Sequence, residues 1–427
     1  MKFGGTSVAD AERIKRAAGR VARSREEGNR VVAVLSARGH TTDELIRMAR
    51  EVSPRPDPRE MDMLLSTGER ISCALAAMVL NDLGHRAESF SGSQAGIVTD
   101  TSHTKARIID VRADRIRAAL DDGKIALVAG FQGTSAFARE DGGYTIHGNV
   151  TTLGRGGSDT TAVAIAAALG ADVCEIYTDV RGVYSADPRI VSDARKLSQV
   201  SFEEMLEMAA SGAKVLQLRS VEYARNHGVR IHCRSSFEDE PGTFVLTEEE
   251  TMERPLVTAV THSTDEARVT LTGLPDVPKV AGKVLTALAE ANVNVDMIIQ
   301  NEPESEGHGA DMSFTVPRDE VVTAREALGP LKDELGFGAI ATDESIGTVS
   351  LIGAGMKSHP GVAAKTFSVI GDAGINIEMI STSPIKISCV VREADVARAV
   401  RDLHAAFELG DNGIRPEDPQ GDHRPKI

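Results

Sequence analysis

A glycine-rich segment at residues 151–161 contains the residue types best suited to bind an anion. It has the sequence Thr-Thr-Leu-Gly-Arg-Gly-Gly-Ser-Asp-Thr-Thr and leads into an Ala-rich helix, 162–169, that is expected to end at Gly170. Ser158 is a natural N-cap for this helix, and the free amides of a helix start attract negative charge. Arg155 adds a cation, and the glycines permit close backbone approach. An ordinary capped turn has the same composition, so both interpretations stay open.

The start of the chain combines a cation with two glycines and hydroxyl groups in the same way. Lys2 is followed by Gly4 and Gly5, and a helix is expected from near Asp10. A lysine ammonium is a compact point charge, which suits phosphate oxygens that move as a phosphoryl group is transferred. A solvated lysine near the start of a chain is the alternative.

A third polar cluster, 177–189, follows a predicted strand at 173–178. Ligands of open α/β sheets bind at the carboxyl ends of the strands, so this segment is a candidate nucleotide loop. A surface hairpin fits the pattern equally well. The sequence has no GxxxxGK[ST] motif, no GxGxxG motif and no protein-kinase catalytic loop, so neither a P-loop nor a Rossmann site is supported.

The elements that must position these clusters alternate short β-branched runs with Ala-rich stretches up to about residue 247. Strands are predicted at 31–35, 125–129, 173–178 and 229–233, and apolar residues at helical spacing predict helices around 14–21 and 64–78. This alternation is typical of a layered α/β domain. The Gly-rich stretch 136–147 is expected to form an exposed hairpin, and the acidic, polar stretch 247–265 an exposed linker.

Beyond the linker the sequence repeats itself. Segments 269–273, 280–283 and 291–298 match segments 349–353, 362–365 and 373–380. Each copy predicts a strand, a turn with Pro or Gly, an amphipathic helix and a strand entered through an Asn-containing turn. A solenoid needs at least three repeats to bury its faces, so two copies indicate a pair of small α+β domains.

Composition excludes several functional classes. The 427 residues carry a formal net charge of −15, which argues against a nucleic-acid partner because such binding needs a basic surface. The four cysteines, Cys73, Cys174, Cys233 and Cys389, have no metal-ligand spacing, so we expect reduced, buried thiols and no metal site. No stretch reaches the roughly 18 apolar residues of a membrane span, so we expect no membrane partner and a cytoplasmic location.

In this order, the clusters resemble those of the amino-acid kinase family, and in detail those of the aspartate kinases. Further matching segments are 34–37, 41–45, 64–69, 130–133 and 293–297, and the resemblance extends from Lys2 to about Leu409. It implies an α/β sandwich of the carbamate-kinase type around a mostly parallel sheet, followed by two α+β ACT domains. We therefore predict a catalytic domain at 1–247, a linker at 248–264, ACT domains at 265–340 and 347–411, and a tail at 412–427.

The resemblance also implies phosphorylation of the side-chain carboxylate of L-aspartate by MgATP, the first step toward lysine, threonine and methionine. Lys2 would lie against the transferring phosphoryl group, and Asp159 would hold that lysine. The aspartate pocket would be lined by Ser36, Thr42, Glu69, Phe131, Arg155, Gly156 and Ser158. The nucleotide would contact Lys2, Gly4, Gly5, Thr178, Asp179, Tyr184, Arg189 and Lys214.

The chemistry of that reaction fits these residue types. An aspartate side chain has a pKa of about 3.9 and is ionised at neutral pH, so no general base is required. The reaction instead needs charge neutralisation, which Lys2, the Mg²⁺ that accompanies ATP and backbone amides can supply. Arg155 can bind the α-carboxylate of the substrate bidentately, and Glu69 can accept from its α-ammonium. A helix N-terminal acid is the alternative for Glu69, and surface positions are the alternative for the outer nucleotide residues.

Paired ACT domains in the resembling family bind end-product amino acids, lysine and often threonine. The matching positions are Asp276, Ala281, Asn294, Val295, Asp296, Gln300, Asn376, Ile377 and Ser383. Left-handed turn chemistry is the alternative for Asn294 and Asn376. Lys279, Ala363 and Pro384 replace a Gly, a Thr and an acidic residue that are common in relatives, so inhibition by lysine plus threonine is expected to be weakened.

The ACT pair further implies a homo-oligomer, or an alpha/beta hetero-oligomer if Met252 is an internal start. One rival is a kinase of the same fold that acts on glutamate, acetylglutamate or a nucleotide. The spacing of Ser36 and Thr42, Glu69 and the ACT pair disfavour it. The other rival is a catalytically silent amino-acid sensor, which has no need of a phosphoryl-stabilising Lys2.

Overall fold

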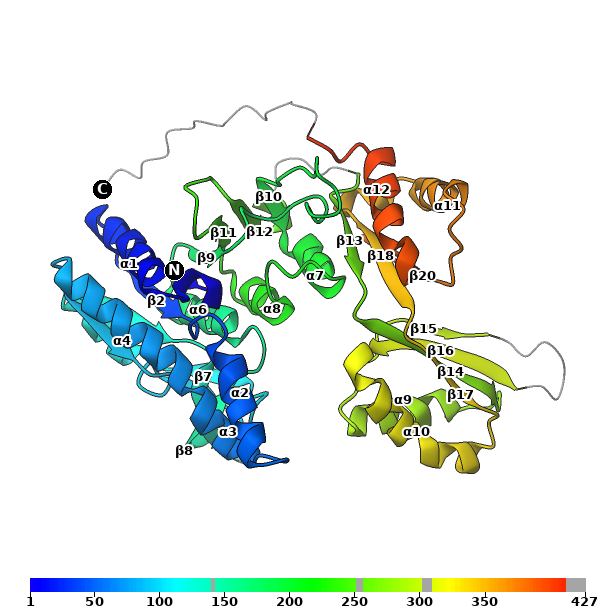
Figure 1. Ribbon diagram of the computed structural model, residues 1–427, viewed down its shortest axis with the longest axis horizontal. Coiled ribbons are helices and arrows are strands. Elements are labelled where there is room, and N and C mark those ends of the chain that lie inside the picture. Colours follow the sequence, from blue (N-terminus) through cyan, green and yellow to red (C-terminus); the bar gives the residue numbers. More distant parts are fainter. Residues whose placement is uncertain (140–142, 251–255, 302–308, 412–427) are drawn as a thin grey trace. The chain divides into compact units, whose positions relative to one another are not determined.

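The computed structural model describes residues 1–139, 143–250, 256–301 and 309–411. The chain forms two compact units (Figure 1). The first comprises Met1–Val183 and Lys196–Glu253, and the second comprises Tyr184–Arg195 and Arg254–Ile427. The mostly parallel α/β sheet and the two smaller α+β domains predicted from the sequence are confirmed.

The first unit is built on an eight-stranded sheet with β1 near its centre. Its order is β10 (Gln199–Ser201), β12 (Thr243–Leu246), β11 (Ile231–Ser235), β9 (Cys174–Thr178), β1 (Lys2–Phe3), β2 (Val32–Leu35), β6 (Ile125–Ala129) and β3 (Ala87–Phe90). All neighbours are parallel except β11 and β12. The carboxyl ends of β1, β2, β6 and β9 therefore meet at one edge, where open α/β sheets bind ligands.

Helices cover both faces of this sheet. On one face α1 (Ala11–Glu26) and α4 (Thr67–Asp82) pack on Phe3, Leu35 and Leu127 in one apolar core. Alternation along a strand sends the neighbouring side chains to the other face, where α6 (Gly157–Leu169), α8 (Leu218–His227) and α5 (Asp114–Asp121) lie. The helix predicted near Asp10 is confirmed, since the Asp10 side chain accepts from the Arg13 amide at the start of α1.

A second, four-stranded sheet completes the first unit. Its order is β5 (Ile108–Val111), β4 (Ile97–Thr99), β7 (Gln132–Ala138) and β8 (Tyr144–Thr152). Strands β7 and β8 form the predicted exposed hairpin, whose residues 140–142 lie outside the described residues. The remaining helices are α2 (Thr41–Val52), α3 (Pro58–Leu65) and α7 (Phe202–Ala210).

One stretch among the described residues, Pro58–Asp82, is long and apolar enough to cross a membrane, although half of its most apolar window is buried. It comprises α3 and α4, and α4 belongs to the core described above. The side of α4 that packs inward is not the one suggested by spacing. Ile71 and Met78 are exposed, whereas Cys73, Ala76 and Leu80 are buried.

The second unit contains two antiparallel sheets, each with two helices. The first sheet has the order β15 (Ile298–Gln300), β16 (Ala310–Pro317), β14 (Glu266–Leu274) and β17 (Ile340–Asp343), with α9 (Val280–Glu290) and α10 (Val321–Leu335). The second has the order β13 (Ala259–Ser263), β18 (Ile346–Ile352), β20 (Lys386–Arg392) and β19 (Met379–Ser383), with α11 (Val362–Asp372) and α12 (Val396–Ala406).

Two predicted domain boundaries differ from the structure. The predicted linker 248–264 contains β13, whose residues Ala259 and Val260 are fully buried and which pairs with β18. Residues 184–195 were expected in the catalytic domain but belong to the second unit. There Ser185 Oγ lies 3.0 Å from His404 Nε2, and the Ser185 carbonyl accepts from the Val260 amide at 2.7 Å. Both errors concern pairing between distant segments, which local composition does not reveal.

The turn before α9 is strained where its counterpart before α11 is not. Lys279 has a φ of 78°, and the matching Gly361 has a φ of 102°. A residue with a side chain in this left-handed region is strained by about 1–2 kcal/mol. A glycine there is unstrained, but its unfolded chain is more flexible, which offsets part of that gain in stability. We expect Lys279→Gly to raise the free energy of unfolding by up to about 1 kcal/mol, measured by urea or thermal unfolding.

The matched control is Lys332→Gly, at an exposed position inside α10. A glycine in a helix interior lowers stability by about 1 kcal/mol relative to alanine, so this variant should be less stable. A Lys279→Gly protein that is no more stable than the parent would contradict the assignment of strain.

Candidate active site

The centre of the site is a buried ion pair between β1 and α6. Lys2 Nζ lies 2.5 Å from Asp159 Oδ1, and the side chains are 11% and 9% exposed. Phe3 stacks on Tyr177 on the opposite face of the sheet, with ring centroids 4.8 Å apart, so alternation directs Lys2 toward α6. An ammonium has three N–H donors, and Asp159 Oδ1 is within ion-pair distance of it although it accepts no hydrogen bond. Lys2 is therefore a buried cation held in a fixed direction.

The amino end of α6 is formed by glycines in the left-handed conformation. Gly156 has a φ of 72°, and a Cβ atom there would lie 2.2 Å from Gln217 Cγ, so only glycine fits this turn. Gly170 ends the helix with a φ of 63°, as predicted. The predicted N-cap role of Ser158 is wrong, because Gly156 is the cap and Ser158 lies inside the first turn. Ser158 instead packs so closely on Gly130 that a Cβ atom there would be 2.7 Å from its Oγ.

The loops that follow β1 and β2 lie directly against each other. A Cβ atom on Gly5 would be 2.9 Å from the Ala37 carbonyl, and the Gly39 amide donates to the Gly5 carbonyl at 3.0 Å. A Cβ atom on Gly4 would lie 3.5 Å from Lys2 Nζ. The two glycines thus keep this loop close to the lysine and to the loop after β2. Ser36 follows β2 at the same edge of the sheet.

Glu69 presents a buried carboxylate oxygen without a partner. The residue lies in the first turn of α4 and is 3% exposed. Its Oε1 accepts from the Ala37 amide at 3.1 Å, while its Oε2 is buried and accepts no hydrogen bond. Burial raises the pKa of Glu69 to about 7, although the Ala37 amide acts in the opposite direction. A solvated helix acid has neither property, so the geometry favours an acceptor for a ligand cation.

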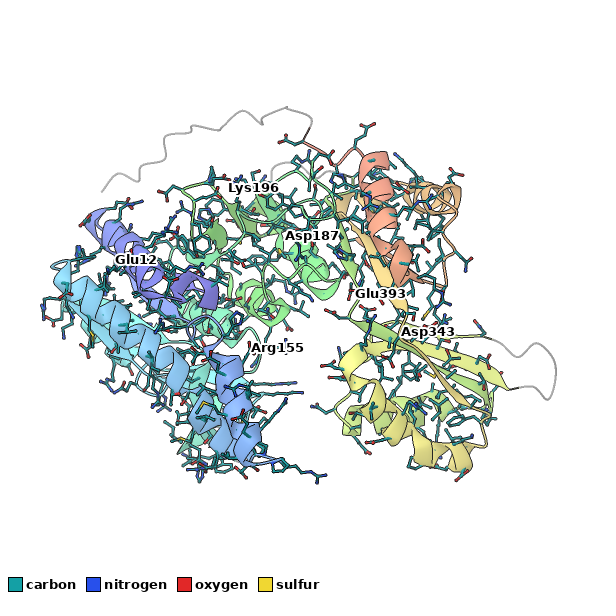
Figure 2. The ribbon with its side chains drawn as sticks, in the orientation of Figure 1. Glu12, Arg155, Asp187, Lys196, Asp343 and Glu393 are labelled. Atoms are coloured by element: carbon teal, nitrogen blue, oxygen red, sulfur yellow. The ribbon has the colours of Figure 1, made fainter. Side chains whose placement is uncertain are left out.

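Phe131, Arg155 and Thr42 lie around the glycine-rich turn and the second helix. Phe131 has a φ of 67°, donates from its amide to Thr161 Oγ1 at 3.2 Å and lies against Gly157. Arg155 is exposed at the edge of the first unit, between the α2 and α8 ribbons in the view of Figure 2. Thr42 is half-buried in the first turn of α2.

The predicted nucleotide residues fall in both units. In the first, Thr178 ends β9 and donates from Oγ1 to Asp179 Oδ1 at 3.2 Å, and Lys214 is exposed between α7 and α8. Tyr184 and Arg189 belong to the second unit, where Arg189 pairs with Asp187, labelled in Figure 2. Their assignment to the nucleotide stays a prediction.

Comparison with known proteins places this geometry in a family. Residues 1–235 match the amino acid kinase family, and residues 268–333 and 349–407 match ACT domains. An aspartokinase of Mycolicibacterium smegmatis is 57% identical over 411 residues, which cover 96% of each chain. The chain belongs to the aspartokinase family. The resemblance inferred from the sequence is confirmed.

Other members of the aspartokinase family agree with this placement. The aspartokinase of Corynebacterium glutamicum is 52% identical over 96% of each chain. A crystal structure of E. coli aspartokinase III in complex with aspartate and ADP has a TM-score of 0.79 at 26% identity, covering 95% of this chain and 98% of that one. The predicted fold, an amino acid kinase domain followed by two ACT domains, is confirmed.

Sequence reasoning missed two polar side chains of this aspartokinase fold, the buried Gln132 and the half-buried Arg219, that tie the segments of the site together. Gln132 in β7 donates from Nε2 to the Ser66 carbonyl at 2.8 Å and accepts from Arg70 Nε at 3.1 Å. Arg219 in α8 donates to the Leu153 carbonyl at 2.8 Å. Gln132 lies within the matched motif 130–133, from which only Phe131 was chosen. The sequence therefore contained the signal for Gln132, but it did not reveal its hydrogen-bond partners.

The nine candidate effector positions lie in the ACT domains of the second unit. Asp276, Asn294, Asp296, Gln300 and Asn376 are exposed, Ser383 ends β19, and Ala281, Val295 and Ile377 pack against the ACT cores. The left-handed turn residues are Asn292 and Gly374, so that alternative is wrong for Asn294 and Asn376. The Asn294 amide donates to Glu320 Oε2 at 3.1 Å.

The cysteines and acidic residues complete the description of the site chemistry. All four cysteines are free and buried, as predicted. In the part of the chain that the structure describes, no group of three or more His, Cys, Asp or Glu side chains is arranged to hold a metal ion.

Proposed function

We propose that this chain transfers the terminal phosphoryl group of MgATP to the side-chain carboxylate of L-aspartate, giving 4-phospho-L-aspartate and ADP. One observation carries the proposal, namely the Lys2–Asp159 ion pair beside the glycine-formed start of α6. Membership in the aspartokinase family supports it, as does the E. coli structure that holds aspartate and ADP.

Lys2 is the catalytic residue of this mechanism. The substrate carboxylate is already ionised, so the protein must mainly neutralise charge as two anions approach. The Lys2 ammonium donates to the oxygens of the transferring phosphoryl group, and amides at the start of α6 add positive potential. Asp159 is a positioning residue, because it holds Lys2 without touching the reacting atoms. The magnesium ion belongs to the MgATP substrate and neutralises phosphate charge.

The α-ammonium and α-carboxylate of aspartate are bound by residues of opposite charge. The unpartnered oxygen of Glu69 accepts from the ammonium, and Arg155 binds the carboxylate through two parallel hydrogen bonds. The rest of the aspartate pocket consists of Ser36, Thr42, Phe131, Gly156 and Ser158. The nucleotide is bound in the first unit by Gly4, Gly5, Thr178, Asp179 and Lys214. The assignment of Tyr184 and Arg189, which belong to the second unit, stays a prediction.

ADP release with aspartate or glutamate as acceptor tests this function. A pocket shaped for aspartate must accommodate one extra methylene in glutamate, which is worth about 10–200-fold in kcat/KM. We expect aspartate to be preferred by at least about tenfold. Equal turnover of glutamate would favour the rival kinase, and no ADP release with either amino acid would favour the silent sensor.

We further propose that the ACT domains respond only weakly to lysine and threonine. The E. coli structure in complex with lysine and aspartate shows a family member with such a ligand. In this chain Ala363 and Pro384 lack the hydroxyl and the carboxylate that are common in relatives, and Lys279 places a side chain where a Gly is common. With both amino acids at millimolar concentration we expect most ADP release to continue. Near-complete inhibition would contradict this, and Ala363→Thr is the matched variant expected to strengthen inhibition.

Assembly and location complete the proposal. The chain forms a homo-oligomer, or an alpha/beta hetero-oligomer in which a shorter subunit starts at Met252, a residue outside the described ones. A single full-length band from native cells would exclude the shorter subunit. The protein works in the cytoplasm, without a membrane or nucleic-acid partner, in keeping with its net charge of −15.

A further inference from the structure

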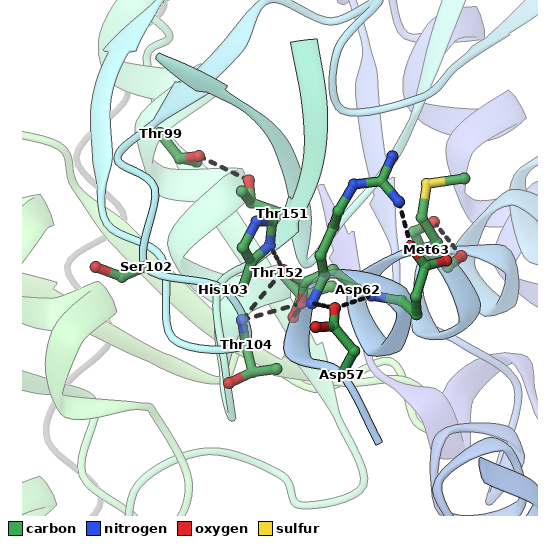
Figure 3. Close-up of polar contacts among 12 residues, drawn as sticks. Asp57, Asp62, Met63, Thr99, Ser102, His103, Thr104, Thr151 and Thr152 are labelled. Atoms are coloured by element: carbon green, nitrogen blue, oxygen red, sulfur yellow. Dashed lines mark hydrogen bonds and ion pairs between the residues drawn. The ribbon is translucent and has the colours of Figure 1, made fainter. Parts of the chain in front are cut away.

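A fully buried carboxylate, Asp62 in α3, lies outside the substrate and nucleotide residues proposed above. Its side chain has no exposed surface, and three polar groups converge on it (Figure 3). Thr152 Oγ1 in β8 donates at 2.5 Å, and His103 Nδ1 lies 2.6 Å from the other carboxylate oxygen. The Thr104 amide donates to both oxygens, at 3.0 and 3.1 Å. Such a carboxylate joins α3, the loop 101–105 and β8 into one rigid assembly.

The loop 101–105, which is hydrogen-bonded to Asp62, contacts the glycine-rich turn. Thr104 has a φ of 67°, which is costly for a β-branched residue and persists only where the surroundings enforce it. Its carbonyl would lie 3.2 Å from a Cβ atom on Gly154, so the two backbones are in close contact. The next turn is tied to the same strand, since the Ala106 amide donates to the Thr152 carbonyl at 2.9 Å. Asp62 thus supports the segment that carries Arg155.

The same carboxylate is linked to Glu69 along the chain. Asp62 lies seven residues before Glu69, and the two helices that carry them join at Ser66. Thr152, the partner of Asp62 in β8, lies three residues before Arg155. The buried Asp62 side chain therefore connects two segments. One carries Glu69, which is proposed to accept from the substrate ammonium, and the other carries Arg155, which is proposed to donate to the substrate α-carboxylate.

We propose that Asp62 is a positioning residue that sets the spacing between Glu69 and Arg155, and thereby selects acceptors that carry both an α-ammonium and an α-carboxylate. The inference rests on the proposed function, because it assigns a role relative to bound aspartate. A displacement of about 1 Å in a positioning group can cost about a hundredfold in rate. The hydrogen bonds of Asp62 are therefore expected to affect substrate choice without any contact to the substrate.

The experiment measures steady-state ADP release by the full chain with aspartate and with succinate, which lacks the α-ammonium. For Asp62→Ala we expect the KM for aspartate to rise about tenfold or more and the KM for ATP to change less than about twofold. The preference for aspartate over succinate should narrow, because only aspartate engages both Glu69 and Arg155. Asp62→Asn keeps the shape and an acceptor oxygen, so its effects should be smaller.

Glu204→Ala is the matched control. Glu204 is also a buried carboxylate of the first unit, accepting from the amide and hydroxyl of Ser201 at the start of α7. We expect it to lower the melting temperature and to leave the KM for aspartate and the preference over succinate unchanged. Asp62 variants that behave in the same way would overturn the inference, since their role would then be structural only.

Two further results keep the outcome decisive. If Asp62→Ala does not fold, Thr152→Val removes only the hydroxyl that donates to Asp62, and the same shift in substrate preference is required of it. An unchanged preference in Thr152→Val and Asp62→Asn would then overturn the inference. A parent protein that releases no ADP with aspartate would instead refute the proposed function, which is a separate result.

Discussion

Lys2→Ala is expected to lower kcat for ADP formation with aspartate by about a thousandfold. A preorganised donor aimed at developing charge is worth about 10²–10³ in kcat, and Lys2 is a buried cation in a fixed direction. The KM for aspartate should change little, because the lysine acts on the phosphoryl group. Steady-state ADP release at saturating substrates checks this. A folded Lys2→Ala protein that keeps kcat within about tenfold of the parent would remove Lys2 from the mechanism.

The control for this prediction must separate catalysis from stability. Removing Lys2 leaves Asp159 buried and without its cation, which costs about 3–5 kcal/mol when one partner of a buried pair is deleted. The double variant Lys2→Met with Asp159→Asn replaces both charges and should recover stability while remaining inactive. Asp159→Asn alone keeps the ammonium and should lose less activity than Lys2→Ala. Thermal unfolding of all three variants shows whether lost activity reflects lost structure.

The affinity for aspartate is expected to fall as the pH is lowered below about 7. Burial raises the pKa of Glu69 to about 7, so below that pH the carboxyl is neutral and loses its attraction for the ammonium. Above it the group is ionised and binding is independent of pH. The KM for aspartate should therefore rise about tenfold per pH unit below 7. The side chain of aspartate, with a pKa of about 3.9, stays ionised across this range and cannot cause the effect.

Glu69→Gln tests the same group in two ways. The variant should lose the pH dependence and bind aspartate about 10–100-fold more weakly, since a hydrogen bond to a charged group is worth about 1.5–3 kcal/mol. Although the variant binds aspartate more weakly, its free energy of unfolding should be higher than that of the parent above pH 7. The unfolded chain releases this proton near pH 4.3 and the folded chain near pH 7, so stability falls as the pH rises through that window. At pH 8 the variant should unfold at a higher temperature than the parent. A pH dependence that persists in Glu69→Gln would assign it to another group.

The sequence predicted those elements whose start and end depend only on neighbouring residues. Strand β6, Ile125–Ala129, has the predicted bounds because it is a continuous apolar run buried on both faces. The first helix begins next to Asp10, where a helix start was predicted, and α6 ends at the predicted Gly170. Lys2 and Asp159 were chosen from two motifs far apart in the sequence, and the sheet brings them into contact.

The rest depends on contacts that no local pattern contains. Ser158 has the residue type of an N-cap, but a left-handed glycine already turns the chain into the helix. Strand β13 has a plain alternating sequence, and its partner β18 lies more than 80 residues further along the chain. Asp62 is one acid in a short helix, and its partners, among them Thr152, lie 41 to 90 residues away. In each case the deciding interaction is tertiary.

The segment 184–195 makes the two halves of the polypeptide incomplete without each other. Ala186 and Val191 are buried in the same apolar cluster as Val260 and Leu409, although the chain reaches them before the kinase fold is finished. A regulatory fragment that starts after residue 250 would have a cavity where these side chains belong. A fragment ending there would carry two unsheltered apolar residues. Such fragments should aggregate when produced alone and regain solubility when expressed together.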